Sequence, residues 1–386
     1  MTPGARIAAA IEILDQVGDG LPAEQILTRW GRNNRFAGSK DRAAIRDHVF
    51  DVLRCRRSAA HAGGASTGRG LMLGLLRLQG IDPATLFNGE GHAPAALEPH
   101  EIDATAEEMP PAVALDLPDW LLDAFRASLG YDADKSAQAL QNRAPVTLRV
   151  NLAQTDKSAA IAQLGTDGVS VVPNPLADTA LRVTDGSRRI RNGTAYQSGM
   201  VELQDAASQA VVMALPDAQR LLDYCAGGGG KALAMAARSD AQVTAHDADP
   251  NRMKDIAPRA ERAGVSIETA ETSALVPAGY DLVLTDVPCS GSGSWRRAPE
   301  AKWHFTPDRL QDLTRLQDDI LDRAAMLVAP RGTLAYATCS VLRQENGDRI
   351  AAFLDRHPQW SCNFERSFTI DADGDGFYTA HLTAPE

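Results

Sequence analysis

The chain of 386 residues lacks several patterns that would assign it to a common class of protein. No apolar run reaches the roughly 18 residues that a membrane-spanning helix needs. The N-terminus leads into a helical pattern rather than a signal peptide, so we expect a cytoplasmic protein without a membrane partner. The five cysteines, at positions 55, 225, 289, 339 and 362, form no CxxC pair and no His/Cys cluster with zinc spacing. This spacing predicts reduced thiols and no bound metal.

Two common nucleotide-binding motifs are also missing. Neither the dinucleotide fingerprint GxGxxG nor the phosphate-binding GxxxxGK[ST] occurs. Instead, residues 226–231 read Ala-Gly-Gly-Gly-Gly-Lys between a strand-like and a helical segment. Such a glycine run lets the backbone approach a ligand closely, and Asp247, at the end of the next strand, suits ribose hydroxyls. This arrangement favours S-adenosylmethionine over a nicotinamide dinucleotide.

The net charge of −11 argues against a general nucleic-acid binder, but the charge is unevenly distributed. Residues 29–57 contain nine basic and three acidic residues, a local net charge of +6 that leaves −17 for the remainder. Residues 88–125 contain nine acidic residues and no lysine or arginine. The basic stretch is either a solvated helix face or an RNA contact. The residues assigned to RNA contact are Arg29, Arg32, Arg35, Lys40, Arg42 and Arg46.

The periodicity of apolar residues divides the chain into four parts. Residues 1–85 read as an all-α domain, 86–112 as an acidic linker with prolines, and 113–198 as connecting helices followed by a small α+β unit. Residues 199–386 alternate helices (206–214, 232–238, 309–327) with strands (220–225, 242–246, 266–269, 282–285, 333–337). This order predicts the α/β class, with a Rossmann-like doubly wound sheet in the last part.

Two cysteines, Cys289 and Cys339, each follow an apolar run that reads as a strand. The carboxyl ends of parallel strands meet at one edge of a sheet, where ligands and chemistry collect. A thiolate there can attack carbon 6 of cytosine, which makes carbon 5 nucleophilic toward a methyl group. Asp286, if protonated, can donate a hydrogen bond to ring nitrogen 3. The competing interpretation is that both cysteines are small apolar core residues.

Taken together, these segments resemble the RsmB/Sun-type RNA 5-methylcytosine methyltransferases. The small unit that begins Pro145-Val-Thr-Leu-Arg resembles the family's RRM-like unit, and residues 37–42 resemble its NusB-like RNA-binding domain. Several pieces of the C-terminal half match in the family's order. They are Gln204-Asp-Ala-Ala-Ser, Asp223-Tyr-Cys-Ala-Gly-Gly-Gly-Gly-Lys, Asp247, Asp286-Val-Pro-Cys-Ser-Gly-Ser-Gly, Trp295-Arg-Arg-Ala-Pro-Glu-Ala-Lys-Trp, and Ala337-Thr-Cys-Ser-Val followed by Glu345-Asn346.

The resemblance implies a role for each matching position. Cys339 corresponds to the nucleophile, Cys289 to the cysteine that assists product release, and Asp286 to a residue near both base and cofactor. Gly227 and Gly228 replace the usual Ala-Pro, and Ala232 replaces a threonine. The usual aspartate after the next strand is missing, and Glu271 is the closest substitute. The implied contacts of S-adenosylmethionine are Cys225, Ala226, Gly227, Gly228, Gly229, Gly230, Lys231, Asp247, Glu271 and Asp286.

The implied activity is methylation of carbon 5 of a cytosine in ribosomal RNA, that of the small subunit (16S), by a monomer. Arg296, Arg297 and Lys302 would hold phosphates near the base, unless they are only solvated surface residues. Three alternatives remain at this point. They are the same reaction on transfer RNA, a catalytically silent RNA-binding assembly factor, and a DNA cytosine methyltransferase with Cys289 as its nucleophile.

Overall fold

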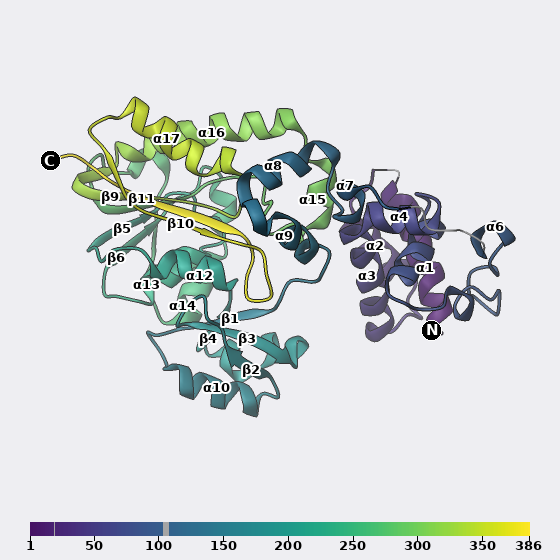
Figure 1. Cartoon of the computed structure of the whole chain (residues 1–386). Helices are drawn as coiled ribbons and strands as arrows, with labels where there is room; N and C mark the ends of the chain where they lie inside the picture. Colours follow the sequence, from purple (N-terminus) through teal and green to yellow (C-terminus); the bar gives the residue numbers. More distant parts are fainter. Residues whose placement is uncertain (19, 103–107) are drawn as a thin grey trace. The chain divides into compact units, whose positions relative to one another are not determined.

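The computed structural model describes residues 1–18, 20–102 and 108–386 (Figure 1). The chain folds into two compact units. The first comprises Met1–Arg126, Ala133–Arg143 and Trp295–His304, and the second comprises Ala127–Asp132, Ala144–Ser294 and Phe305–Glu386. Of the expected acidic linker, residues 103–107 lie outside the described residues.

The first unit is helical, and within residues 1–85 this agrees with the all-α domain that the sequence pattern predicts. Its N-terminal helices are α1 (Pro3–Gly18), α2 (Ala23–Asn33), α3 (Ser39–Arg54), α4 (Arg56–Gly63) and α5 (Gly68–Leu78). They bury one apolar face each, with Ile13, Val49 and Leu73 fully inside. Shorter helices follow: η1 (Pro83–Thr85), α6 (Pro99–Ile102), α7 (Pro111–Ala114), α8 (Asp119–Leu129), η2 (Gly130–Asp132) and α9 (Ala133–Leu140).

Segment 295–304, distant in sequence, belongs to this helical unit and contains α15 (Pro299–His304). The last carbonyl groups of α3 lack partners within that helix. The Trp303 indole donates to the Leu53 carbonyl at 2.7 Å, and the Lys302 ammonium donates to the Arg54 carbonyl at 3.3 Å. In return, Arg54 Nε donates to the Arg296 carbonyl at 2.8 Å. Segment 295–304 therefore caps the end of α3.

The second unit contains two sheets. The smaller one is antiparallel with strand order β2-β3-β1-β4. Its elements are β1 (Thr147–Val150), α10 (Lys157–Thr166), β2 (Ser170–Pro173), β3 (Ala180–Asp185), η3 (Ser187–Asn192), α11 (Thr194–Gln197) and β4 (Val201–Leu203). This confirms the small α+β unit that the alternation in 146–151 predicts.

The larger sheet has seven strands in the order β10-β11-β9-β8-β5-β6-β7, with the five strands β5–β9 parallel. These strands are β5 (Arg220–Asp223), β6 (Gln242–Ala245), β7 (Glu268–Thr269), β8 (Tyr280–Asp286) and β9 (Val328–Thr338). The sequence pattern did not predict the antiparallel strands β10 (Ser361–Phe368) and β11 (Phe377–Thr383). The Rossmann-like expectation is confirmed.

Helices cover both faces of this sheet (Figure 1). One face packs against α12 (Ala206–Met213), α13 (Gly230–Ala236) and α14 (Ile256–Ala263), and the other against α16 (Pro307–Ala325) and α17 (Gly347–Arg356). Three short turns, η4 (Pro250–Met253), η5 (Thr272–Ala274) and η6 (Arg343–Glu345), complete the second unit. No helix among the described residues is long and apolar enough to cross a membrane.

Candidate functional site

Two thiols meet at the carboxyl edge of the larger sheet. Cys339 directly follows β9, and Cys289 lies three residues after the neighbouring β8. Their sulfur atoms are 3.4 Å apart. The structure thus brings together the two cysteines that the strand-end argument singled out, while their separate roles stay a prediction.

The two thiols differ in their ease of ionisation. A hydrogen bond from Cys289 holds the pKa of the Cys339 thiol below its ordinary value, and the nearby Lys231 ammonium acts in the same direction against the opposing effect of burial. The same hydrogen bond, together with burial, raises the pKa of Cys289 well above the ordinary thiol value. When the pair loses a proton, these shifts favour its loss from Cys339, with Cys289 as the donor of the hydrogen bond between them.

Beside the thiols, Lys231 and Asp286 form a close ion pair. The Lys231 Nζ atom lies 2.6 Å from Asp286 Oδ2, and only 8% of the lysine side chain is exposed. Burial alone would lower the pKa of Lys231, but the Asp286 carboxylate keeps it above its usual value. Asp286 thus accepts a hydrogen bond from Lys231 here, whereas the sequence analysis expected it to donate one to the base.

The glycine loop connects β5 to α13 with a backbone that side chains rarely adopt. Gly227 and Gly229 have φ angles of +50° and +79°, a region open to glycine at no steric cost. The Gly227 amide donates to Asp247 Oδ2 at 2.9 Å, and Arg252 pairs with the same carboxylate at 3.0 Å. The loop therefore leads directly to the acid at the end of β6.

Asp223, the last residue of β5, is fully buried, and neither of its carboxylate oxygens has a hydrogen-bond partner in the described part of the chain. Burial, reinforced by the negative charge of Asp286, raises its pKa to about 7. Burial also raises the pKa of the neighbouring Cys225 thiol. A buried acid without a partner at a strand end is a polar group that a ligand can satisfy.

Glu271, the expected adenine-side residue, is exposed at the residue before η5. The next residue, Thr272, contacts His246 Nε2 through its hydroxyl at 2.9 Å, and His246 Nδ1 lies 2.7 Å from the Tyr224 carbonyl. His246 thereby links the glycine-loop strand to the loop after β7. The sequence analysis did not select His246, because a single buried histidine has no distinctive spacing.

The sequence analysis also assigned no role to Glu345 and Asn346, which contact the residues next to the two thiols. Glu345 accepts hydrogen bonds from Ser290 and Ser340, which directly follow the two cysteines. Asn346 accepts from the Thr338 hydroxyl at 2.6 Å and donates to the Ser340 carbonyl at 3.0 Å, on either side of Cys339. The only signal for either residue is the Glu-Asn dipeptide within the resemblance.

The expected RNA contacts divide into exposed and buried residues. All six cations selected from 29–46 are exposed on α2, on α3 and on the turn between them. Arg46 pairs with Glu24, and Arg42 donates to the Ala37 carbonyl at 2.9 Å. Arg297 is also exposed.

Arg296 and Lys302 correct the expectation that they hold phosphates, because they are only 2% and 1% exposed. Burial lowers the pKa of Lys302 to about 8, and its ammonium caps α3 and lies over the Trp303 ring at 4.4 Å. Within the described residues, no group of three or more His, Cys, Asp and Glu is placed to hold a metal ion.

Comparison with known proteins places this site in a family. Residues 210–383 match the model of the 16S rRNA methyltransferase RsmB/F family, and residues 117–188 match the ferredoxin-like domain of RsmF/B-like methyltransferases. The ribosomal RNA small subunit methyltransferase B of Xylella fastidiosa (strain Temecula1) is 33% identical over 388 residues, which cover 89% of this chain and 90% of that protein.

One further relative and one solved structure are also similar to this chain. The probable ribosomal RNA small subunit methyltransferase B of Bacillus subtilis is 34% identical over 255 residues, but these cover only 63% of this chain and 57% of that protein. A solved methyltransferase homolog protein from Pyrococcus horikoshii shares the fold with a TM-score of 0.61 at 23% identity, over 75% of this chain and 100% of that one. The chain therefore belongs to the RsmB/F family of 16S rRNA methyltransferases.

Proposed function

We propose that the protein transfers a methyl group from S-adenosylmethionine to carbon 5 of a cytosine in small-subunit ribosomal RNA. The observation that carries the proposal is the pair of thiols 3.4 Å apart at the strand ends, beside the Lys231–Asp286 ion pair. The names of the relatives, which are ribosomal RNA small subunit methyltransferases, support the choice of RNA.

The residues around the glycine loop suit S-adenosylmethionine, which supplies the methyl group when it is bound. The buried Asp247 carboxylate at the end of β6 can accept ribose hydroxyls. The buried Asp223 acid at the end of β5 suits a cofactor that carries a positive charge, since that charge would favour its ionised form. The glycines at 227–230 would let backbone groups approach the ligand closely. At Gly229 a side chain does not fit, because its Cβ would come within 2.8 Å of Ile256. Glu271 stays the proposed adenine-side contact.

In the proposed reaction, Cys339 is the nucleophile. Its thiolate attacks carbon 6 of the cytosine, forming a carbon–sulfur bond and moving an electron pair toward carbon 5. The negative charge that develops at ring nitrogen 3 needs a proton donor. Asp286 can take this proton from the Lys231 ammonium at 2.6 Å and pass it on.

Product release then requires loss of the carbon 5 proton to a base and departure of Cys339 as a thiolate. We assign Cys289 to this release step, since its sulfur is 3.4 Å from that of Cys339. The opposite assignment, with Cys289 as the nucleophile, is the arrangement of the DNA cytosine methyltransferase alternative. The lowered pKa of Cys339 and the raised pKa of Cys289 support Cys339.

Variants that replace one cysteine at a time test this proposal. Each is incubated with labelled S-adenosylmethionine and 16S rRNA, and transfer of the label to the RNA is measured. Cys339→Ala should abolish methyl transfer, because no covalent activation of the ring is possible. Cys289→Ala should accumulate a protein–RNA adduct that survives denaturation, because release is blocked. Cys362→Ser, a substitution in β10 away from the strand-end pair, is the control and should behave as the wild type.

The opposite pattern, an inactive Cys289→Ala and an adduct with Cys339→Ala, would reverse the roles of the two thiols. Transfer of label to transfer RNA but not to 16S rRNA would change the substrate. A wild-type protein that binds RNA but labels none of these nucleic acids would indicate an RNA-binding factor without this activity.

A further inference from the structure

A single buried carboxylate, that of Glu345, connects the two segments that carry the thiols. Glu345 ends η6 and is completely inaccessible to solvent. Its Oε1 atom accepts a hydrogen bond from the Ser290 amide at 2.8 Å. Its Oε2 atom accepts from the Ser340 hydroxyl at 2.5 Å and from the Ser290 hydroxyl. Because these serines directly follow Cys289 and Cys339, the two cysteine-bearing segments are hydrogen-bonded to the same carboxylate.

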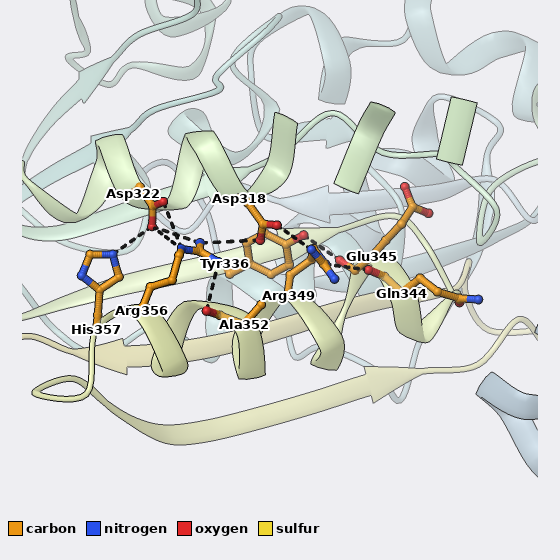
Figure 2. A network of polar contacts seen from close by, with 9 residues as sticks. All are labelled: Asp318, Asp322, Tyr336, Gln344, Glu345, Arg349, Ala352, Arg356 and His357. Carbon is orange, nitrogen blue, oxygen red and sulfur yellow. Dashed lines mark hydrogen bonds and ion pairs between the residues drawn. The ribbon is translucent and has the colours of Figure 1, made fainter. Parts of the chain in front are cut away.

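Glu345 is itself held by the framework of the second unit. Gln317 of α16 donates from Nε2 to Glu345 Oε1 at 3.1 Å and to the Pro288 carbonyl at 3.0 Å. The Tyr336 hydroxyl of β9 donates to the Glu345 carbonyl at 2.6 Å (Figure 2).

The helix after Glu345 is fixed in turn. In α17, Arg349 pairs with Asp318 of α16 at 2.5 Å, and Arg356 pairs with Asp322 at 3.0 Å (Figure 2). These two ion pairs join α17 to α16, and neither includes Glu345 itself.

The donors around Glu345 select for a carboxylate. Two hydroxyls, one backbone amide and one side-chain amide point at its two oxygens. A carboxylate offers only acceptors, so it satisfies all four donors. A glutamine at this position would turn an NH₂ group toward donors and leave buried polar groups unpaired.

The charge of Glu345 also acts on the thiol pair. After the hydrogen bond to Cys339 and burial, the negative charges of Cys339 and Glu345 add to the causes that raise the pKa of Cys289. A Cys289 that keeps its proton can donate to Cys339, which is the leading cause of the lowered pKa of Cys339. The carboxylate thus favours one of the two possible protonation states of the pair.

We propose that Glu345 is a positioning residue that holds the segments carrying Cys289 and Cys339 in place relative to each other, so that the two thiols stay in hydrogen-bond contact. It acts through Ser290 and Ser340 and does not touch the substrate. Its consequence for methyl transfer rests on the proposed function. Its effect on the two thiols does not, because the thiols exist and ionise without RNA or methyl donor.

The test compares Glu345→Gln with the control variant Asp322→Asn. Asp322 lies in α16 and pairs with Arg356 and His357 rather than with the serines that contact Glu345. Each protein is treated briefly with iodoacetamide at pH 7, and mass spectrometry measures the ratio of label on Cys339 to label on Cys289. In Glu345→Gln the ratio should fall by about tenfold, the change in thiolate fraction that a shift of one pKa unit produces below the pKa. Asp322→Asn should keep the wild-type ratio.

Methyl transfer provides the second measurement. In Glu345→Gln, kcat should fall while the KM for S-adenosylmethionine stays within about twofold, because misplaced reacting groups slow the chemical step. A wild-type labelling ratio in a folded Glu345→Gln protein would overturn the proposal. If Glu345→Gln does not fold, the double variant Ser290→Ala with Ser340→Ala takes its place. An unchanged ratio there would overturn the proposal equally.

The labelling result separates this proposal from the proposed function. A shifted labelling ratio in a protein whose wild type methylates no RNA would support the positioning role and reject the reaction. A wild type that methylates 16S rRNA, together with a Glu345→Gln variant whose labelling and kcat are unaltered, would support the proposed reaction and reject the positioning role.

Discussion

At the scale of single residues, the proposed chemistry depends on how one sulfur changes the ionisation of the other. Thiolates react and thiols do not, so the pKa of Cys339 decides its reactivity near neutral pH. The hydrogen bond from Cys289 stabilises the thiolate of Cys339 and is the leading cause of its lowered pKa. The thiolate fraction at a given pH below the pKa is therefore larger than for an ordinary cysteine.

This leads to a prediction for the pH dependence of thiol reactivity. In Cys289→Ala, the Cys339 thiolate loses its donor, so its pKa should rise and its alkylation profile should move to higher pH. The rate of modification at Cys339 is measured by mass spectrometry from pH 5 to pH 10. The buried Cys225, whose pKa is raised, is the internal control and should react slowly in both proteins. A profile of Cys339 that does not move would show that Cys289 has no influence on it.

The residue scale also shows what sequence reasoning can and cannot find. Cys289 and Cys339 were predictable because each ends an apolar run, and strand ends in a parallel sheet share one edge. Glu345 was not, since its contacts depend on the turn after Cys339 and on a serine 55 positions earlier in the chain. Lys302 misled the prediction because charge in a sequence carries no information on burial, and Trp303 and α3 enclose its side chain.

At the scale of elements, close packing of α4 and α5 depends on glycine. A Cβ atom at Gly74 would lie 1.8 Å from the Ala59 carbonyl oxygen, and one at Gly63 would lie 1.8 Å from the Gly70 carbonyl oxygen. Real Cβ contacts are never so short, so the two helices can cross at this distance only without side chains. The small, glycine-rich stretch 61–70 is typical of a turn or loop when read as sequence, yet α4 and α5 together occupy six of its ten residues.

Gly74→Ala should therefore destabilise the helical unit. We expect a loss of about 1–3 kcal/mol in the free energy of unfolding, the usual cost of adding a methyl group to a close-packed interface. Chemical denaturation followed by circular dichroism measures it. Gly18→Ala is the matched control, because a Cβ there meets nothing within 4 Å. Equal stability of the two variants would mean that α4 and α5 separate without cost.

The β10–β11 hairpin illustrates why other elements escaped prediction. In β10, mostly exposed residues are interrupted only by half-buried ones until Phe368, so the strand has no continuous apolar pattern. In β11, polar Thr379 and His381 are buried between apolar residues. Both strands form because β9 offers a free edge, to which β11 pairs from Tyr378 to Thr383. That edge is a property of the assembled sheet and is not visible in local sequence.

At the scale of the whole molecule, charge is segregated along the chain. The net charge is −11, yet the six cations selected on α2, α3 and their connection are all exposed. An acidic protein repels RNA at long range, so attraction has to come from a local concentration of positive charge. The salt dependence of binding counts the phosphates that such a group neutralises.

We therefore expect the triple variant Arg32→Ala, Arg35→Ala and Lys40→Ala to bind 16S rRNA more weakly and with a flatter salt dependence. Each lost phosphate contact should reduce the slope of log affinity against log salt by about 0.7–0.9. Filter binding from 50 to 300 mM salt, roughly the range in which such slopes are linear, measures it. Lys302→Met is the control, because it removes a cation that is buried and caps α3. Its slope should equal that of the wild type, whereas equal slopes for the triple variant and the wild type would show that the exposed cations on α2 and α3 do not contact RNA.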